Sequence, residues 1–231
     1  MIPPPAVCTW RNKLSRHERV GFMVNIITIE REYGCGGGEI AQNVSRQLGW
    51  KLWDQRLTEE IARLAHCPKS VVEERQEKND PLYYRLFKSF MRGSYEGAIN
   101  APKLNLVDSE TILKITRRVV EHAAEAGKCV IVGRGSQQFL KTRQDTLRIF
   151  LYAPREDKVR RLLSRGKSEQ EAEELVDTVD QERADYIHKY FNAEWPDRPI
   201  YHALLNTAIG DDCAANMILS LVQTYEVRCN P

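Results

Sequence analysis

The feature that most constrains this sequence is a glycine-rich stretch between an apolar run and an amphipathic segment. The run Val24–Ile29 is short and rich in β-branched residues, which is typical of a buried strand. The letters E-R-E-Y-G-C-G-G-G-E follow it, and Ile40, Val44 and Leu48 then recur at helical spacing. Strand, glycines and helix in this order predict a loop whose backbone N–H groups and helix N-terminus bind an anion.

The loop lacks two side chains of the complete phosphate-binding pattern G-x-x-x-x-G-K-[ST]. If the helix begins at Ile40, Gly37 takes the place of the lysine and Glu39 that of the hydroxyl residue. Two interpretations follow: a nucleotide-binding loop with replaced side chains, and a purely structural glycine turn. Arg31 can supply the positive charge that the missing lysine would give to the phosphates, or it is a surface charge. Glu39 can hold Mg²⁺ through water, or it only favours the helix N-terminus.

Strand-like and helix-like segments alternate along the rest of the chain. Further strands are expected at Lys51–Asp54, Cys129–Val132, Leu147–Tyr152 and His202–Thr207. Helices are expected at Ser109–Ala126, Arg155–Arg165, from a capping box at Ser168 to Tyr190, and at Asp212–Glu226. The alternation favours a parallel sheet with helices on both faces, in which ligands bind beyond the carboxyl ends of the strands. Three loops with polar residues leave those ends, at Arg31–Glu39, Asp54–Arg56 and Gly133–Gly135.

The composition argues against several classes of protein. The 231 residues, 42% of them hydrophobic, suffice for one domain or one domain with an insertion. The formal net charge of +2 gives no support to a nucleic-acid partner. No apolar run is long enough to cross a membrane. The six cysteines form no C-x-x-C pair, which favours the reducing cytoplasm over a zinc or disulfide framework.

Two local expectations concern the start of the chain and the loop cysteine. Residues 1–22 contain three consecutive prolines and basic residues without periodicity, and we expect a disordered extension before a domain at 23–231. Cys35 is expected to be exposed in the glycine loop. A helix N-terminus lowers the pKa of a nearby thiol, so Cys35 is a candidate redox switch, although a small loop residue needs no such role.

Four segments together resemble the cytidylate kinase-like family, a P-loop group related to bacterial cytidylate kinase. They are I-T-I-E-R-E-Y-G-C-G-G-G-E-I-A, L-G-W-K-L-W-D-Q-R-L, C-V-I-V-G-R-G, and V-D-Q-E-R-A-D-Y-I-H-K-Y-F followed by E-W. The similarity extends from about Val24 to Glu226. It implies a P-loop NTPase-like three-layer α/β fold with a parallel five-stranded sheet. It also implies a helical acceptor-binding insertion at about 55–107 and a lid region at about 155–192.

The resemblance implies roles for individual residues. The donor phosphates of ATP would bind the loop residues Gly34, Cys35, Gly36, Gly37, Gly38 and Glu39. Asp54 and Arg56 would begin the acceptor site, with Arg134 directed at the acceptor phosphate. The lid would supply Arg161, Arg165 and Arg183 to the transferring phosphoryl group, and Arg31 completes the predicted catalytic set. Glu39 and Asp54 are the candidate Mg²⁺ ligands.

Each of these roles has a structural alternative. Arg134 lies between glycines directly after a strand, so it can reach into a cleft, but a salt bridge would also explain it. Asp54 can bind Mg²⁺ or a ribose hydroxyl, or cap the helix that follows. Arg183 shares a segment with Asp180 and Glu182, which is also the pattern of a solvated charged face.

The sequence therefore predicts ATP- and Mg²⁺-dependent phosphoryl transfer to a small phosphorylated acceptor, first of all CMP or dCMP. The protein would be a cytoplasmic monomer or homodimer that binds a nucleotide and neither nucleic acid nor membrane. The departures are the missing lysine and hydroxyl, Gly38 where members often have arginine, and Gly135 where related kinases have G-R-D. Each removes charge stabilisation from the transition state. Two alternatives stay open: a nucleotide-binding sensor or partner protein without catalysis, and a kinase of a non-nucleotide acceptor.

Overall fold

The protein was analysed as a computed structural model, which describes residues 23–65 and 109–229. The expected extension at 1–22 and most of the expected insertion at 55–107 lie outside these residues. The elements, in chain order, are β1 (Ile26–Arg31), α1 (Gly37–Leu48), β2 (Lys51–Trp53), α2 (Gln55–Ala65), α5 (Ser109–Ala126), β3 (Cys129–Val132), α6 (Ser136–Phe139), β4 (Thr146–Tyr152), α7 (Arg155–Ser164), α8 (Glu169–Phe191), η1 (Arg198–Ile200), β5 (Ala203–Asn206), η2 (Thr207–Ile209) and α9 (Asp211–Cys229).

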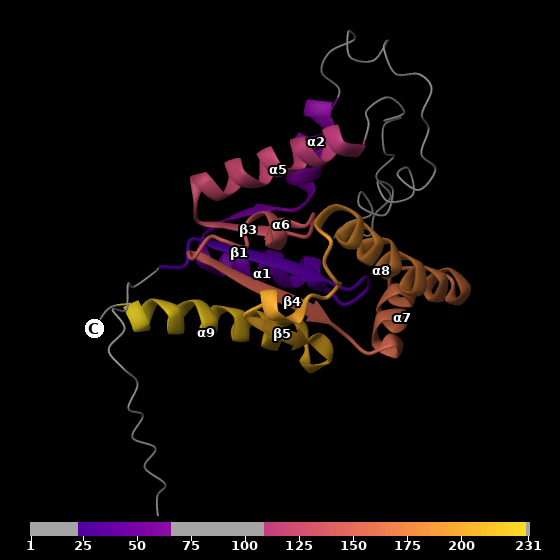
Figure 1. Cartoon of the computed structure of the whole chain (residues 1–231). Helices are drawn as coiled ribbons and strands as arrows, with labels where there is room; N and C mark the ends of the chain where they lie inside the picture. The colour runs from indigo at the N-terminus through magenta and orange to yellow at the C-terminus, as the bar shows by residue number, and fades with distance from the viewer. Residues whose placement is uncertain (1–22, 66–108, 230–231) are drawn as a thin grey trace, which may run out of the picture.

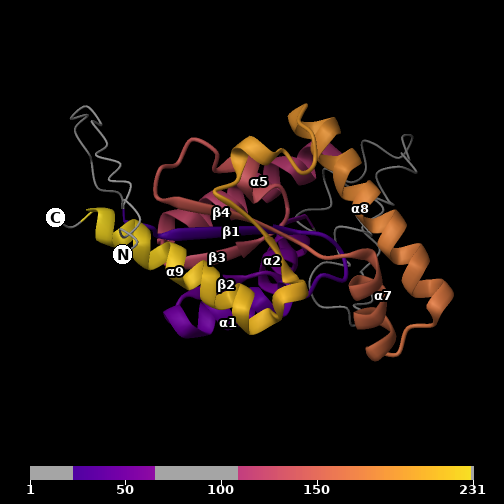
Figure 2. The same cartoon turned by 90° about the horizontal axis from the view of Figure 1, so that it is seen from below.

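The five strands form one parallel sheet in the order β2-β3-β1-β4-β5. Helices α2 and α5 cover one face of the sheet, and α1 and α9 cover the other (Figures 1 and 2). This confirms the predicted three-layer α/β fold of P-loop proteins. None of the described helices is long and apolar enough to span a membrane.

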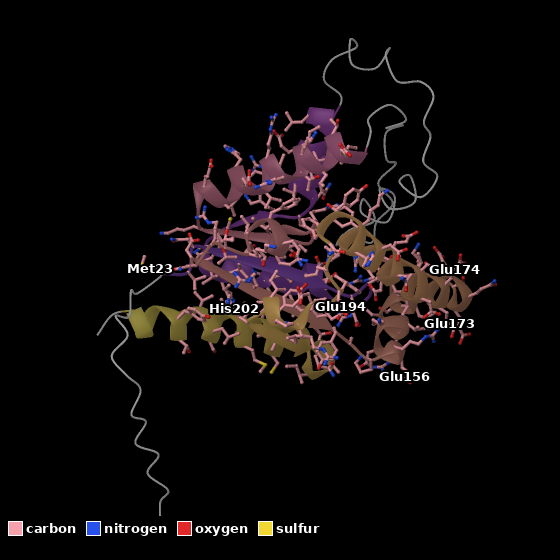
Figure 3. All side chains as sticks on the ribbon, in the orientation of Figure 1. Met23, Glu156, Glu173, Glu174, Glu194 and His202 are labelled. Carbon is pink, nitrogen blue, oxygen red and sulfur yellow. The ribbon has the colours of Figure 1, made fainter. Side chains whose placement is uncertain are left out.

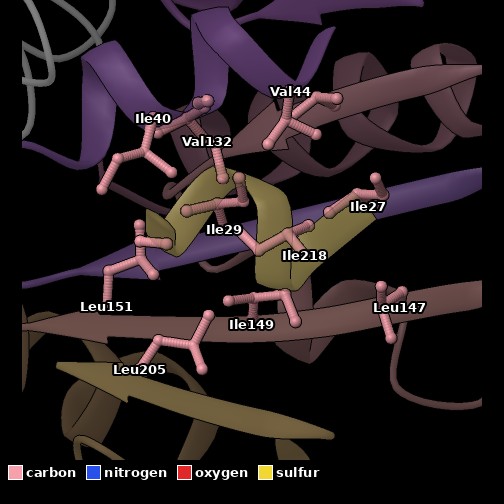
Figure 4. Packing of buried hydrophobic residues seen from close by; sticks show 14 of the residues in the cluster. Ile27, Ile29, Ile40, Val44, Val132, Leu147, Ile149, Leu151, Leu205 and Ile218 are labelled. Carbon is pink, nitrogen blue, oxygen red and sulfur yellow. The ribbon is translucent and has the colours of Figure 1, made fainter. Parts of the chain in front are cut away.

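The sheet is buried on both faces because its strands alternate between two apolar cores. Ile27 and Ile29 of β1 pack with Ile149 and Leu151 of β4 toward α1 and α9 (Figure 4). Ile26 faces the opposite core, together with residues of α2 and α5. All six residues of β1 are buried, including the charged Glu30 and Arg31 at its end. Strand β1 is thus the central strand and ends on two buried charges.

Two boundaries and one short helix differ most from the sequence expectation. Strand β1 continues to Arg31, which we expected in the loop, because Glu30 and Arg31 still pair with Phe150 and Leu151 of β4. Helix α1 begins at Gly37 rather than near Ile40. The short helix α6 after β3 was not predicted. Charged residues in a strand and glycines in a helix both have low propensities, so tertiary pairing overrides local preference here.

Helices α7 and α8 lie together at one end of the molecule (Figures 1 and 2). They enclose an apolar cluster that includes Tyr33 of the glycine loop, whose other buried members are Leu162, Ala172, Leu175, Val176 and Val179. The exposed Glu156, Glu173 and Glu174 lie on the outer side of this α7–α8 pair (Figure 3). The segment predicted as a lid therefore packs against the loop with its inner surface.

Helix α8 begins with the predicted N-cap, because the Ser168 hydroxyl accepts a hydrogen bond from the Glu171 N–H at 3.2 Å. We expect Ser168→Ala to lower the stability of the protein by about 1 kcal/mol, whereas Ser168→Asn retains it. Thermal unfolding followed by circular dichroism measures the difference. Ser220→Ala is the control, since that hydroxyl only donates to the Asn216 carbonyl within α9. Equal stability of Ser168→Ala and wild type would contradict the cap.

Candidate functional site

A pocket opens where the glycine loop leaves the central strand. It encloses about 270 Å³ of open space, solvent included, and is lined by Arg31, Glu32, Tyr33, Gly34, Gly36, Gly37, Gly38, Glu39 and Arg183. Gly36 is the N-cap of α1, and no side chain caps that helix. The N–H groups of the first turn of α1 therefore remain available to an anion.

Arg31 crosses the site from one loop to another. A Cβ atom added at Gly37 would lie 2.8 Å from Cγ of Arg31, and one added at Gly133 would lie 2.1 Å from its Nη1. The stem of Arg31 thus occupies the space beside Gly37, and its guanidinium reaches the loop after β3. Arg31 is only 6% exposed, and Nη1 lies 3.6 Å from Oε1 of Glu30. The alternative that Arg31 is a surface charge was wrong.

Three arginines share this buried region. The pKa of Arg134 is lowered to about 9, first by burial and then by the charge of Arg31, with a smaller effect of Arg183. The pKa of Arg31 is lowered as well, by burial and by Arg183. Asp54 opposes both shifts, so its carboxylate lies near the two guanidinium groups. Burying like charges together is unfavourable, and the carboxylates of Glu30 and Asp54 offset part of that cost for Arg31.

The loop after β3 explains the missing aspartate of the G-R-D pattern. Gly133, Arg134 and Gly135 have φ angles of 68°, 64° and 68°, so three successive residues are left-handed. That conformation strains an arginine, and such strain concentrates at functional sites. A Cβ at Gly135 would lie 2.8 Å from Cε2 of Phe191 on α8. The ring of Phe191 therefore leaves no room for an aspartate at this position.

The α7–α8 pair brings its arginines to the glycine loop. Arg161 forms two hydrogen bonds with Asp211, at 2.7 and 2.8 Å, and these bonds raise its pKa. Its guanidinium lies over Gly36, with Cζ 2.6 Å from the position of an added Cβ. Arg165 Nη2 lies 2.5 Å from Oε1 of Glu39. Two carboxylates thus hold these arginines at the outer side of the loop.

Arg183 enters the pocket itself. Its Nη1 donates to the Arg31 carbonyl oxygen at 2.8 Å and to Oδ1 of Asp180 at 3.2 Å. Its side chain is 12% exposed, so the alternative of a solvated charged face was wrong for Arg183. Arg56, by contrast, is exposed and its guanidinium lies over the ring of Trp53, 5.4 Å from the centroid. No contact in the described part of the chain brings Arg56 to the loop.

The residues present fit phosphates better than a metal ion held by protein alone. The glycines of the loop present backbone amides beside the buried Arg31 and Arg183. Among the described residues, no three His, Cys, Asp or Glu side chains could hold a metal together. Mg²⁺ in nucleotide sites needs only one or two carboxylates besides phosphate oxygens. Of the two candidate ligands, Glu39 forms an ion pair with Arg165.

The expectation for Cys35 was wrong. Cys35 is 0% exposed, and its thiol lies 3.7 Å from the Leu151 carbonyl oxygen. Burial raises its pKa to about 12, although the Gly37 N–H and nearby arginines act in the opposite direction. Desolvation of the thiolate outweighs the helix N-terminus. A buried, protonated thiol lacks both properties of a redox switch.

Sequence reasoning missed the acidic and basic partners of the loop. Lys158 is buried, and its Nζ contacts Glu32 at 3.0 Å and Asp180 at 3.2 Å. Asp211, the partner of Arg161, lay just before the helix expected at Asp212–Glu226. The position of Lys158 in the helix expected at Arg155–Arg165, on the side that packs inward, could have indicated a buried ion pair. No sequence signal indicated the ion pairs Asp180–Lys158 and Asp211–Arg161, because the partners are distant in sequence.

The burial of Cys35 predicts slow alkylation. At pH 8 we expect iodoacetamide to modify the exposed Cys213 while Cys35 reacts only after unfolding. The raised pKa also makes stability depend on pH. Below about pH 9 the thiol is protonated in both the folded and the unfolded state, so it causes no loss of stability there. Stability falls as pH rises from about 9 to about 12, because only the unfolded thiol ionises in that range. Peptide mass spectrometry after timed labelling measures both sites. Equal labelling rates for Cys35 and Cys213 would refute the burial.

Restoring the aspartate should destabilise the protein. We expect Gly135→Asp to lower the free energy of unfolding by roughly 2 kcal/mol, through the left-handed φ and the contact with Phe191. Gly49→Asp is the matched control, since Gly49 has a φ of 67° with no atom within 4 Å of an added Cβ. Denaturant unfolding compares the two variants. If both lost the same stability, the ring of Phe191 would not be the cause.

Comparison with solved structures found several matches to this chain. A crystal structure of an uncharacterized protein from Eubacterium ventriosum matches with a TM-score of 0.61 and 19% identity, over 86% of this chain and 98% of that one. Shikimate kinase from Acinetobacter baumannii in complex with shikimate matches with a TM-score of 0.47 and 15% identity, over 87% and 94%. Dephospho-CoA kinase from Campylobacter jejuni gives 0.39 and 13%, over 87% and 97%.

No curated protein sequence matches the chain significantly. The sequence model of one family matches residues 26–209, which include the glycine loop, the loop after β3 and the α7–α8 pair. This protein therefore belongs to the cytidylate kinase-like family.

Proposed function

We propose that this protein transfers the terminal phosphoryl group of ATP to a small phosphorylated acceptor, first of all CMP or dCMP. Membership of a kinase-like family supports phosphoryl transfer on a P-loop fold. The observation that carries the proposal is the course of Arg31. Its stem occupies the space beside Gly37, where the P-loop lysine would begin, and its guanidinium ends at Gly133, next to Arg134. One cation thus spans the donor loop and the acceptor loop.

This arrangement suits the chemistry of phosphoryl transfer. The reaction needs two phosphates held in line and their negative charge neutralised, and the protein does little covalent work. The glycine loop would hold the donor phosphates through backbone N–H groups. Arg134 would bind the acceptor phosphate, and Arg31 would lie between the two groups. Guanidinium groups suit this role because their planar fork grips phosphate with two hydrogen bonds.

Mg²⁺ would be held by Asp54 together with the phosphate oxygens of the nucleotide. When bound, it neutralises phosphate charge and orients the transferring group. The chain's own contribution is the negative charge of Asp54, which opposes part of the lowering of the pKa of Arg31 and of Arg134. The α7–α8 pair packs on the loop and would keep water away from the phosphoryl group.

A nucleotide-binding sensor or partner protein without catalysis is the second candidate. Two arginines predicted to act on the phosphoryl group are engaged by acidic residues, Arg161 by Asp211 and Arg165 by Glu39. If these ion pairs persist with nucleotide bound, Arg161 and Arg165 contribute less charge to the transferring phosphoryl group. Binding without turnover would then result.

The experiment is calorimetric titration of the full chain with ATP and Mg²⁺, followed by assays of ADP formation. The acceptors are CMP, dCMP, UMP, AMP and a set of phosphorylated metabolites without a base. Turnover with CMP or dCMP supports the proposal. Binding without turnover on any acceptor supports the sensor, and turnover only on a metabolite shows a non-nucleotide acceptor. Absence of ATP binding would refute all three and leave the glycines a structural turn.

Arg31 offers the sharpest variant. We expect Arg31→Ala to lower kcat/KM by about 100- to 1,000-fold, because it removes the cation between the two phosphates. Arg31→Lys keeps the charge but loses the fork, so its loss should be smaller. Arg117→Ala is the control, since Arg117 is exposed on α5 and, among the described residues, forms an ion pair with Glu121 alone.

Circular dichroism and thermal unfolding would show whether each variant is folded. A folded Arg31→Ala protein with kcat/KM within twofold of wild type would refute the proposed role of Arg31.

A further inference from the structure

We propose that Asp180 is a positioning residue, which aligns Arg183 with the pocket at the glycine loop and links that alignment to the place of α7. The inference rests on the proposed function, since it names how one of the phosphate-binding arginines is held. Asp180 lies on α8 and faces the loop rather than the solvent, with a side chain 15% exposed. It was expected only as part of a charged helix face.

One carboxylate joins three segments of the chain. Oδ1 of Asp180 accepts from the backbone N–H of Tyr33 at 2.7 Å and from Nη1 of Arg183 at 3.2 Å. Its Oδ2 accepts from Nζ of Lys158 on α7 at 3.2 Å. Asp180 therefore contacts the start of the glycine loop, helix α7, and the arginine one turn further along α8.

These contacts orient the guanidinium group of Arg183. Nη1 is engaged twice, by Asp180 and by the Arg31 carbonyl oxygen at the end of β1. Within the described residues, no protein group accepts a hydrogen bond from Nε or Nη2 of Arg183. Arg183 also lines the pocket with Gly34 and Gly36 to Gly38. With one nitrogen fixed in place, the remaining donors are preorganised for an anion on the loop.

Lys158 connects the same carboxylate to α7. Burial opposes its charge, but Asp180 and Glu32 outweigh burial, so the pKa of Lys158 is raised. The backbone of α7 also lies against the loop, because the carbonyl oxygen of Lys158 is 3.2 Å from the position of a Cβ at Gly34. Gly34 has no side chain that would keep α7 at a distance. A shift of α7 would therefore move Lys158, Asp180 and Arg183 together.

The charges distinguish this network from a phosphate site. Lys158 and Arg183 carry two positive charges, and Glu32 and Asp180 carry two negative ones. The charges of this group therefore cancel without a ligand. Asp180 itself would repel phosphate. Its effect on phosphate binding must therefore act through Arg183, which makes the inference testable by a double-mutant cycle.

The test measures the affinity of the full chain for inorganic tripolyphosphate by calorimetry, in four proteins. They are wild type, Asp180→Asn, Arg183→Ala and the double variant. We expect Asp180→Asn to weaken binding about tenfold in the wild-type background and to have no further effect in the Arg183→Ala background. A merely structural role would give the same loss in both backgrounds and would overturn the inference.

Asp177→Asn is the matched control, because Asp177 lies one turn earlier on α8 and pairs with Arg155 at the surface. It should bind tripolyphosphate as wild type does. If Asp180→Asn does not fold, Asp180→Glu completes the same cycle, because it keeps the charge and displaces the carboxylate by one methylene group.

Failure of the proposed function gives a different result. Wild-type protein that binds neither tripolyphosphate nor ATP overturns the proposed function and this inference with it. Tight binding by wild type, with Asp180→Asn unchanged or with equal losses in both backgrounds, overturns the inference about Asp180 alone.

Discussion

The site depends on a buried positive charge at the end of the central strand. Arg31 is held in β1 by pairing with β4, so its side chain cannot reach solvent as a loop residue would. Its stem and guanidinium take the space beside Gly37 and Gly133, so both positions exclude larger side chains. Desolvating a guanidinium is costly, and the charges of Glu30 and Asp54 offset part of that cost. An anion bound beside Arg31 would offset more.

Ion pairs link the α7–α8 pair to the glycine loop at several places. Lys158 and Arg165 each contact an acidic residue that flanks the glycines, Glu32 on one side and Glu39 on the other. Carboxylate and phosphate oxygens are alternative partners for the same donors. The loop can therefore be held in shape without ligand, while a phosphate must compete with Glu39 for Arg165. If phosphate displaces Glu39, Arg165 becomes available for catalysis. If Glu39 keeps Arg165, the protein has one arginine fewer for phosphoryl transfer.

Much of the fold could be predicted because its signals are local. The alternation of strands and helices, the N-cap at Ser168 and the gathering of three loops at one sheet edge all follow from patterns of a few residues. The errors arose where distant contacts override such patterns. Glu30 and Arg31 stay extended because β4 pairs with them. Cys35 is buried because β4 covers it, and burial then reverses the expected shift of its pKa.

By itself, the sequence determined the order of elements, the glycine loop and the arginines that accompany it, since periodicity and loop composition are properties of neighbouring residues. Only the tertiary structure decided which acidic residue meets which cation. Asp180 reaches Tyr33 across 147 positions, and Asp211 reaches Arg161 across 50. It also decided that position 135 must be glycine, through a ring contributed by Phe191. Such contacts depend on how helices pack beyond the sheet, and no short-range pattern encodes that packing.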